Sequence, residues 1–277
     1  MTWLTSLQQA IAYIEQHLLE DLTMTQIAQV GHSSEFHFQR AFSLLTGMTV
    51  NDYIRRRRLT LAAEELQRTE AKVIDVAFKY GYETPEAFTK AFRRQHGISP
   101  IAVRQAKGKI TSYYPLTIEI QLKGVEPMNY QVKQKEAFQV VGIVTTMKDN
   151  SGISALWNQL NANGTTARLA QLNNGDVQGL LGVCLPHAEG IQYVIGVAYQ
   201  GDVPEDFEMV EVPASTWAVF EVIGAMPHAM TNAWQRIYKE WLPSSQYELA
   251  GTAEFELYTE DDPFDDKCYS EIWIPVK

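Results

Sequence analysis

The sequence predicts a multidomain α and α+β protein. An all-α domain of two helix-turn-helix units is followed by an antiparallel α+β domain of two strand-helix-strand-strand repeats. The 277 residues are enough for two domains of roughly 100–200 residues each. Apolar residues recur with helical spacing in the first part of the chain and alternate with period two after it, and each part contains an internal repeat. We place the domains at residues 1–108 and 109–277.

Charge is divided unevenly between these two parts. The whole chain has a net charge of −10, yet residues 1–108 hold 13 Lys and Arg against 11 Asp and Glu, whereas residues 109–277 hold 10 against 22. Such asymmetry indicates that the first part meets a polyanion. No apolar run approaches the roughly 18 residues of a membrane span, and the start lacks a secretory pattern, so we expect a cytoplasmic protein without membrane contact.

Six segments of the first part predict helices. Thr23 and Gln26 form a capping box, and Thr84 followed by Pro85 is a strong helix start because the first helical position needs no N–H partner. Glycine follows four of the segments, at Gly31, Gly47, Gly81 and Gly97. We expect helices over residues 4–18, 24–30, 35–45, 51–66, 72–80 and 85–96.

A short helix, a turn and a second helix occur twice, 50 residues apart. The matching pairs include Gly31/Gly81, Ser34/Thr84, Phe38/Phe88, Ala41/Ala91, Phe42/Phe92 and Gly47/Gly97. This is the helix-turn-helix pattern. The second helix of each copy carries polar and basic residues opposite its two phenylalanines, which suits the major groove of DNA.

The stretch KVIDVAFKYGYETPEAFTKAFRRQHGISP, Lys72 to Pro100, resembles the signature of AraC/XylS-type transcription regulators, and the resemblance covers about residues 5–107. It implies a seven-helix domain whose two recognition helices enter successive major grooves. Carried over by position, the first recognition helix offers Phe36, His37, Gln39 and Arg40, and the second offers Glu86, Ala87, Thr89 and Lys90. Arg94 is a phosphate-contact candidate.

The chemistry of these side chains gives each a provisional role. Arg40 suits guanine and Gln39 suits adenine. Glu86 either accepts a hydrogen bond from cytosine or stabilises its own helix N-terminus. The four consecutive arginines from Arg55 point around the whole helix, so at most two face DNA together, and we expect one or two to pair with Asp52, Glu64 or Glu65.

A linker over residues 105–115 leads into the second part. Two amphipathic helices there, marked by Trp157 and Trp234, lie 77 residues apart, and two strands follow each. We expect strands over residues 116–123, 137–146, 179–185, 193–200, 215–223, 253–259 and 269–276. The two halves together form one antiparallel sheet with both helices on one face, the other face being concave or exposed.

The last strand has two distinct faces. Its aliphatic residues should face the core, which leaves Glu271 between Tyr269 and Trp273 on the opposite face. A carboxylate with aromatic walls suits an organic cation. The alternative is a surface glutamate paired with a lysine, beside ordinary cross-strand aromatic pairs. Glu254, Glu256 and Tyr258 also share one strand face.

The segments FELY at Phe255–Tyr258, DDP at Asp261–Pro263 and YSEIWIPV at Tyr269–Val276 resemble the GyrI-like effector-binding domain of multidrug-sensing regulators. The resemblance, which extends from Pro115 to the end, implies a pocket for hydrophobic, often cationic molecules with its central acidic residue at Glu271. The ligand-binding candidates are Glu271, Trp273, Tyr258, Tyr193, Tyr199 and Trp157.

Both resemblances together predict a regulator that binds double-stranded promoter DNA, senses a hydrophobic or cationic effector and works with RNA polymerase as a monomer or weak dimer. A further hypothesis is that the acidic domain folds back on the basic helices until ligand arrives. The alternative function is a GyrI-like hydrolase acting on electrophilic small molecules, with Glu271 as general base. Because the sequence has no GxSxG, HExxH or phosphate-binding loop, and its two cysteines lack metal-ligand spacing, we expect no catalytic residue, cofactor or metal.

Overall fold

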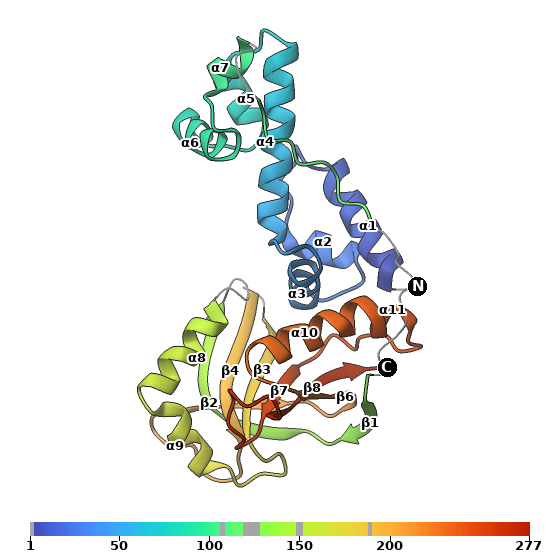
Figure 1. Ribbon diagram of the computed structural model, residues 1–277, viewed down its shortest axis with the longest axis vertical. Coiled ribbons are helices and arrows are strands. Elements are labelled where there is room, and N and C mark those ends of the chain that lie inside the picture. Colours follow the sequence, from blue (N-terminus) through green and yellow to red (C-terminus); the bar gives the residue numbers. More distant parts are fainter. Residues whose placement is uncertain (1–2, 106–108, 119–127, 148–151, 188–189) are drawn as a thin grey trace. The chain divides into compact units, whose positions relative to one another are not determined.

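The computed structural model describes residues 3–105, 109–118, 128–147, 152–187 and 190–277. Its contacts divide the chain into two compact units (Figure 1). The first unit comprises Met1–His32 and Thr46–Leu122, and the second comprises Ser33–Leu45 and Lys123–Lys277. The helix that follows Ser34 therefore packs as part of the second unit, although it belongs in sequence to the helix-turn-helix repeat.

Seven helices occupy the part of the chain predicted to be all-α. They are α1 Trp3–Gln16, α2 Met24–Val30, α3 Glu35–Thr46, α4 Val50–Arg68, α5 Val73–Lys79, α6 Pro85–His96 and α7 Pro100–Arg104. The capping box is confirmed, because the Thr23 side chain accepts from the Gln26 N–H while the Gln26 side chain accepts from the Thr23 N–H. At the start of α6, Thr84 accepts from the Ala87 N–H. The residue pattern did not predict the short α7.

The arginine run of α4 is bound within the first unit. Arg55 lies 2.5 Å from Asp52, as predicted, but Arg57 pairs at 2.7 Å with Glu15 of α1, which was not among the expected partners. Arg58 donates to the backbone carbonyls of Leu18 and Glu20, which follow α1. Arg57 and Arg58 thus join α4 to neighbouring segments of the same unit, whereas Arg55 pairs within α4.

The second unit is built on an eight-stranded antiparallel sheet of order β1-β6-β8-β7-β3-β4-β2-β5. The strands are β1 Tyr130–Lys135, β2 Phe138–Met147, β3 Leu180–His187, β4 Gly190–Ala198, β5 Glu208–Val212, β6 Ser215–Ile223, β7 Glu254–Tyr258 and β8 Tyr269–Val276. The two predicted halves meet at the β7–β3 pair. The two edge strands, β1 and β5, were not predicted. Each pairs with the half that it does not directly precede in the chain: β1 pairs with β6 of the second half, and β5 pairs with β2 of the first half. The strand expected over 116–123 lies partly outside the described residues, and 116–118 form no strand.

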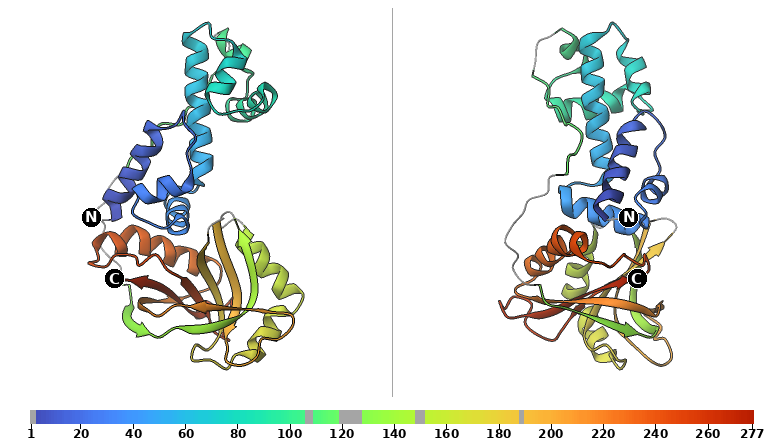
Figure 2. Two further views of the ribbon diagram at one scale, coloured as in Figure 1. Left: turned by 180° about the vertical axis from the view of Figure 1, so that it is seen from behind. Right: turned by 90° about the vertical axis from the view of Figure 1, so that its right-hand side faces the viewer.

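Helices from both halves cover one face of this sheet (Figures 1 and 2). They are α8 Ile153–Ala162 and α9 Thr165–Leu172 from the first half, and α10 His228–Arg236 from the second. The last of these continues through a π-helical turn, Ile237–Trp241, into α11 Leu242–Ser244. None of the described helices is both long and apolar enough to cross a membrane.

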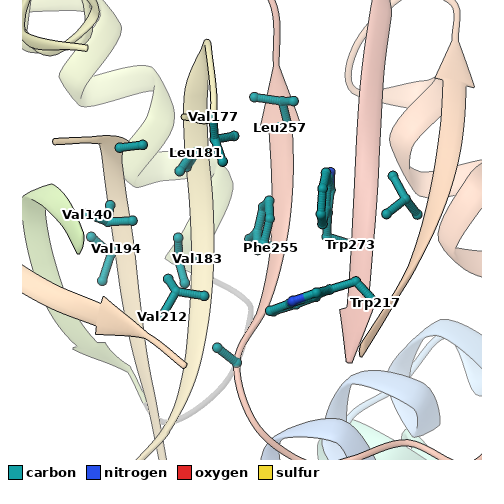
Figure 3. Packing of buried hydrophobic residues seen from close by; sticks show 13 residues of the cluster. Val140, Val177, Leu181, Val183, Val194, Val212, Trp217, Phe255, Leu257 and Trp273 are labelled. Carbon is teal, nitrogen blue, oxygen red and sulfur yellow. The ribbon is translucent and has the colours of Figure 1, made fainter. Parts of the chain in front are cut away.

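The opposite face is filled by its own side chains, so it is not exposed, which was one of the two alternatives expected for it (Figure 3). The Phe255 ring stacks on Trp273 with centroids 5.0 Å apart. Phe138 of β2 reaches within 5.7 Å of Phe255 of β7, although β3 and β4 lie between these strands. Three strand spacings amount to about 14 Å in a flat sheet. The sheet is therefore strongly curved, and its curvature closes this face.

Candidate functional site

Helix α6 presents the residues that were predicted to face DNA. Glu86, Ala87, Lys90 and Arg94 are exposed and Thr89 is half-buried. The opposite side of the helix is anchored by Phe88 and Phe92, which are fully buried in the core of the first unit. The second predicted recognition helix is thus fixed by its apolar side and open on its polar side.

Helix α3 presents a different picture. Phe36, His37 and Arg40 have relative exposures of 1%, 0% and 8%, and Gln39 is half-buried. Phe36 packs in an apolar cluster with residues of β4, α8 and α9. Phe36, His37 and Arg40, three of the four predicted DNA-facing residues, therefore lie inside the second unit, on the helix-covered face of its sheet.

The Arg40 guanidinium occupies a site with two carboxylates and an indole. Its Nη1 donates to Glu254 Oε1 at 2.7 Å, and its Nη2 donates to Glu256 Oε1 at 2.8 Å. The guanidinium carbon lies 3.6 Å from the ring centroid of Trp234 on α10, a close cation–π contact. The two glutamates alternate along β7, so both side chains reach the same face, and α10 covers them.

His37 holds the same carboxylate from its other side. Its Nε2 lies 2.9 Å from Glu254 Oε2, and its Nδ1 lies 2.7 Å from the Ser34 hydroxyl. Both ring nitrogens of His37 are thus in contact with a polar group, the Ser34 hydroxyl at Nδ1 and the carboxylate at Nε2. Glu254, which is fully buried, is thus contacted by α3 at both oxygens, by Arg40 at Oε1 and by His37 at Oε2.

Glu256 is held by donors from α10 and β7 as well as by Arg40. Trp234 Nε1 donates to its Oε1 at 2.6 Å, and the Tyr258 hydroxyl donates to its Oε2 at 2.8 Å. These two donors belong to the sheet and its covering helix and do not depend on α3. They fix the orientation of the carboxylate.

The charges at this site depend on one another. Burial alone would raise the pKa of Glu254, but the positive charge of Arg40 and the contact with His37 bring that pKa below its ordinary value. Burial also acts to lower the pKa of Arg40, and the two glutamates outweigh it, so the guanidinium stays charged. Burial raises the pKa of the Tyr258 hydroxyl, with the Glu256 carboxylate adding to the effect, so the hydroxyl remains a donor. The arrangement places one cation between two carboxylates.

Aromatic residues extend the site along the sheet. Trp157 of α8 donates from Nε1 to the Tyr193 hydroxyl at 2.8 Å, and its ring meets Tyr258 edge-on with centroids 5.0 Å apart. A Cβ on Gly182 would lie only 2.4 Å from the Tyr193 hydroxyl, so a residue without a side chain is required there. Three of the predicted wall residues, Trp157, Tyr193 and Tyr258, are thereby brought together beside Glu256. The Tyr199 hydroxyl donates instead to the Asp202 carbonyl.

Glu271 and Trp273 lie on the other face of the sheet. Cross-strand partners share a face, and Glu271 pairs with Leu257 while Ile272 pairs with Glu256. The two Glu271 oxygens accept from the Tyr269 hydroxyl at 2.7 Å and from Trp273 Nε1 at 2.6 Å, and no lysine pairs with it in the described part of the chain. The structure thus places Glu271 on the opposite face of the sheet from Tyr193 and Tyr258, with which it was grouped as a ligand-binding candidate.

Sequence reasoning missed the acidic pair and the indole that faces it. Glu254 and Glu256 were recognised as sharing a strand face with Tyr258, and this was the available signal. Trp234 was assigned only to an amphipathic helix. Among the described residues no group of His, Cys, Asp and Glu has the arrangement of a metal site, and Cys184 and Cys268 are both buried and free.

Comparison with known families agrees with this architecture. The model of the GyrI-like small molecule binding domain matches residues 128–277, more than half of the chain, and a helix-turn-helix domain model matches residues 27–106. The chain belongs to the GyrI-like family and joins that domain to an AraC-type helix-turn-helix region. Both resemblances predicted from the sequence are confirmed.

Relatives of the helix-turn-helix region are transcription regulators. AarP, an activator of Providencia stuartii, is 40% identical over 98 residues, which are 35% of this chain and 73% of AarP. SoxS of Escherichia coli K12 is 39% identical over 94 residues, 34% of this chain and 88% of SoxS. YbfP of Bacillus subtilis is 40% identical over 107 residues, but the match spans only 39% of this chain and 36% of YbfP. The chain is a transcription regulator with a GyrI-like small-molecule binding domain.

Two solved structures resemble the second part of the chain. One is a bacterial transcription regulation protein of Staphylococcus aureus MU50, 30% identical with a TM-score of 0.50, covering 55% of this chain and 99% of that one. The other is SAV2435 bound to tetraphenylphosphonium, 29% identical with a TM-score of 0.51, covering 54% of this chain and 94% of that one.

Proposed function

We propose that this regulator senses a hydrophobic organic cation, and that the cation binds at Glu254 and Glu256 beneath Trp234. The observation that carries the proposal is the buried guanidinium of Arg40, which those three side chains already hold with two charge-assisted hydrogen bonds and a cation–π contact. A site that binds one delocalised cation in this way suits another of similar charge.

The surroundings favour a hydrophobic cation over a small hydrated one. Trp157, Tyr193 and Tyr258 supply aromatic surface beside Glu256. Residues 109–277 hold 10 Lys and Arg against 22 Asp and Glu, and an excess of acidic residues attracts cations over a distance. The resemblance to SAV2435, which binds tetraphenylphosphonium, supports the same ligand class.

Glu271 is a weaker choice for the acidic residue that binds the effector. Both of its oxygens are already occupied by its own strand neighbours, and its face of the sheet is packed with core residues. The same contacts disfavour Glu271 as the general base of a hydrolase, because a general base must reach the substrate. Glu256 takes the role that Glu271 was expected to have.

For DNA we propose that α6 inserts its exposed residues into a major groove, with Arg94 at a phosphate. Glu86, Ala87 and Lys90 lie on the exposed side of this helix. RNA polymerase remains the expected partner at the promoter, and a monomer or weak dimer the expected form. For α3 the proposed contacts through Phe36, His37, Gln39 and Arg40 require a state in which these residues are exposed.

Calorimetric titration with tetraphenylphosphonium tests the effector proposal. Glu256→Gln keeps the shape of the side chain and removes its charge, and a unit charge about 4 Å away is worth about 4 kcal/mol at an effective dielectric constant near 20. After desolvation we expect a 10- to 100-fold weaker affinity for Glu256→Gln and much less effect for Glu271→Gln. Loss of binding in Glu271→Gln with an unchanged Glu256→Gln would contradict the assignment.

A further inference from the structure

The cation site is occupied by a residue of the chain itself. Arg40 lies on α3, which the helix-turn-helix repeat makes the first recognition helix. Its guanidinium is bound to Glu254 and Glu256 and is only 8% exposed. A side chain buried in this way cannot contact the edge of a base pair.

The rest of the recognition surface of α3 is buried with it. His37 is fully buried against Glu254, and Phe36 is packed among residues of the sheet and of α8. With Arg40 these residues fall on one side of the helix, and they are three of the four positions predicted to enter the major groove. The surface that would read DNA and the surface that contacts the second unit are thus the same.

We propose that Arg40 is an internal ligand of the effector site, and that an organic cation activates DNA binding by displacing it. In the closed state α3 is docked on Glu254 and Glu256 and is unable to enter the groove. When a cation takes the place of the guanidinium, α3 loses its two acidic partners and becomes available to DNA. This inference rests on the proposed cation site and adds the means of its regulation.

Mutual exclusion follows from the hydrogen bonds of the two carboxylates. Glu254 accepts from Arg40 on Oε1 and has His37 beside Oε2, and Glu256 already accepts from Trp234 and Tyr258. The face of the Trp234 ring is covered by the guanidinium at 3.6 Å. A second cation finds neither a free carboxylate oxygen pair nor a free indole face until Arg40 leaves.

Competition for one site supplies the differential affinity that allosteric coupling requires. The cation binds the open state and is excluded from the closed one, so it shifts the population toward the state in which α3 is free. By linkage, DNA that binds α3 must raise the affinity for the cation. The apparent affinity of the resting protein is reduced by the fraction of molecules that are closed.

Removing Arg40 tests the competition directly in the full chain. Arg40→Ala should bind tetraphenylphosphonium at least tenfold more tightly than the natural protein, because the internal competitor is gone. Ser43→Ala, on the same helix and half-buried, is the matched control and should change the dissociation constant by less than twofold. Unchanged affinity in a folded Arg40→Ala protein would overturn the proposal.

A second measurement needs no ligand and leaves Arg40 in place. Glu254→Gln with Glu256→Gln should bind a mixed-sequence DNA duplex at least fivefold more tightly than the natural chain without any ligand, since α3 is no longer held. Glu208→Gln with Glu211→Gln removes the same two charges from exposed positions of β5 and controls for general electrostatic attraction. Equal gains in DNA affinity in both double variants would refute the proposal that the two glutamates hold α3 through Arg40.

The two measurements distinguish this inference from the proposed function. Tighter DNA binding by Glu254→Gln/Glu256→Gln, together with no phosphonium binding by any variant, would support the role of Arg40 as an internal ligand and reject a hydrophobic organic cation as the effector. Phosphonium binding that depends on Glu256 but is unchanged by replacement of Arg40 would support the proposed cation site and reject the role of Arg40 as an internal ligand.

Discussion

Replacing Arg40 by methionine should make the stability of the second unit depend on pH in a new way. Methionine keeps most of the side-chain volume and removes the charge, so Glu254 and Glu256 are left facing each other without a cation. Breaking a buried ion pair by removing one partner costs about 3–5 kcal/mol, because the remaining charge is uncompensated. We expect Arg40→Met to lower the free energy of unfolding by about 3 kcal/mol at pH 7.

The pH dependence follows from the pKa of Glu254. In the natural protein this pKa is lowered, so the carboxylate contributes stability above its ordinary pKa and loses it as pH falls. Without Arg40 the burial effect dominates and the pKa rises, so protonation relieves the penalty in acid. The other groups near this carboxyl are His37, Cys184 and Tyr238, together with the carboxylate of the second glutamate. The destabilisation should shrink by at least about 1.4 kcal/mol between pH 7 and pH 4.5.

Urea unfolding followed by tryptophan fluorescence provides the measurement, since five of the six tryptophans lie in the second unit. Arg168→Met is the control. It breaks an ion pair with Asp206 in the same unit whose side chains are 60% and 67% exposed, and such pairs contribute about 0–1 kcal/mol. Equal losses in the two variants, or a loss for Arg40→Met that grows in acid, would refute the reasoning.

Two further predictions concern the same region. Cys184 lies 3.7 Å from the Arg40 guanidinium and is 1% exposed, so in a Cys268→Ser background Arg40→Ala should accelerate its reaction with a thiol reagent at least tenfold; an unchanged rate would show that α3 does not shield it. Gly182→Ala should push the Tyr193 hydroxyl aside, weaken phosphonium binding several-fold and alter the near-ultraviolet circular dichroism; normal affinity would mean that the aromatic wall adapts.

Regular elements with strong local signals were predictable from the sequence. The period-two alternation placed β6 and β8 at their observed bounds, Ser215–Ile223 and Tyr269–Val276. The capping box gave the start of α2, and Thr84–Pro85 gave the start of α6. The edge strand β1 was missed because its residues are largely exposed and polar, and β5 because it has only five residues; the pairing of both depends on partners distant in the chain.

The choice of sheet face was beyond the reach of local pattern. Alternation separates Glu271 from Ile272, but it does not say which face is covered by helices and which is closed by curvature. Both faces of β8 are buried, so the rule that aliphatic residues mark the core does not identify the ligand face. The partner of Glu254 and Glu256 lies more than 200 residues away on α3, and no local pattern reports such a contact.

The most direct test of the central claim is a crystal structure of the full chain with bound tetraphenylphosphonium. The account predicts the phosphonium against Trp234 and Glu256, with Arg40 withdrawn from between the two carboxylates and His37 no longer beside Glu254. A phosphonium bound elsewhere, with the Arg40 guanidinium still between Glu254 and Glu256, would contradict it.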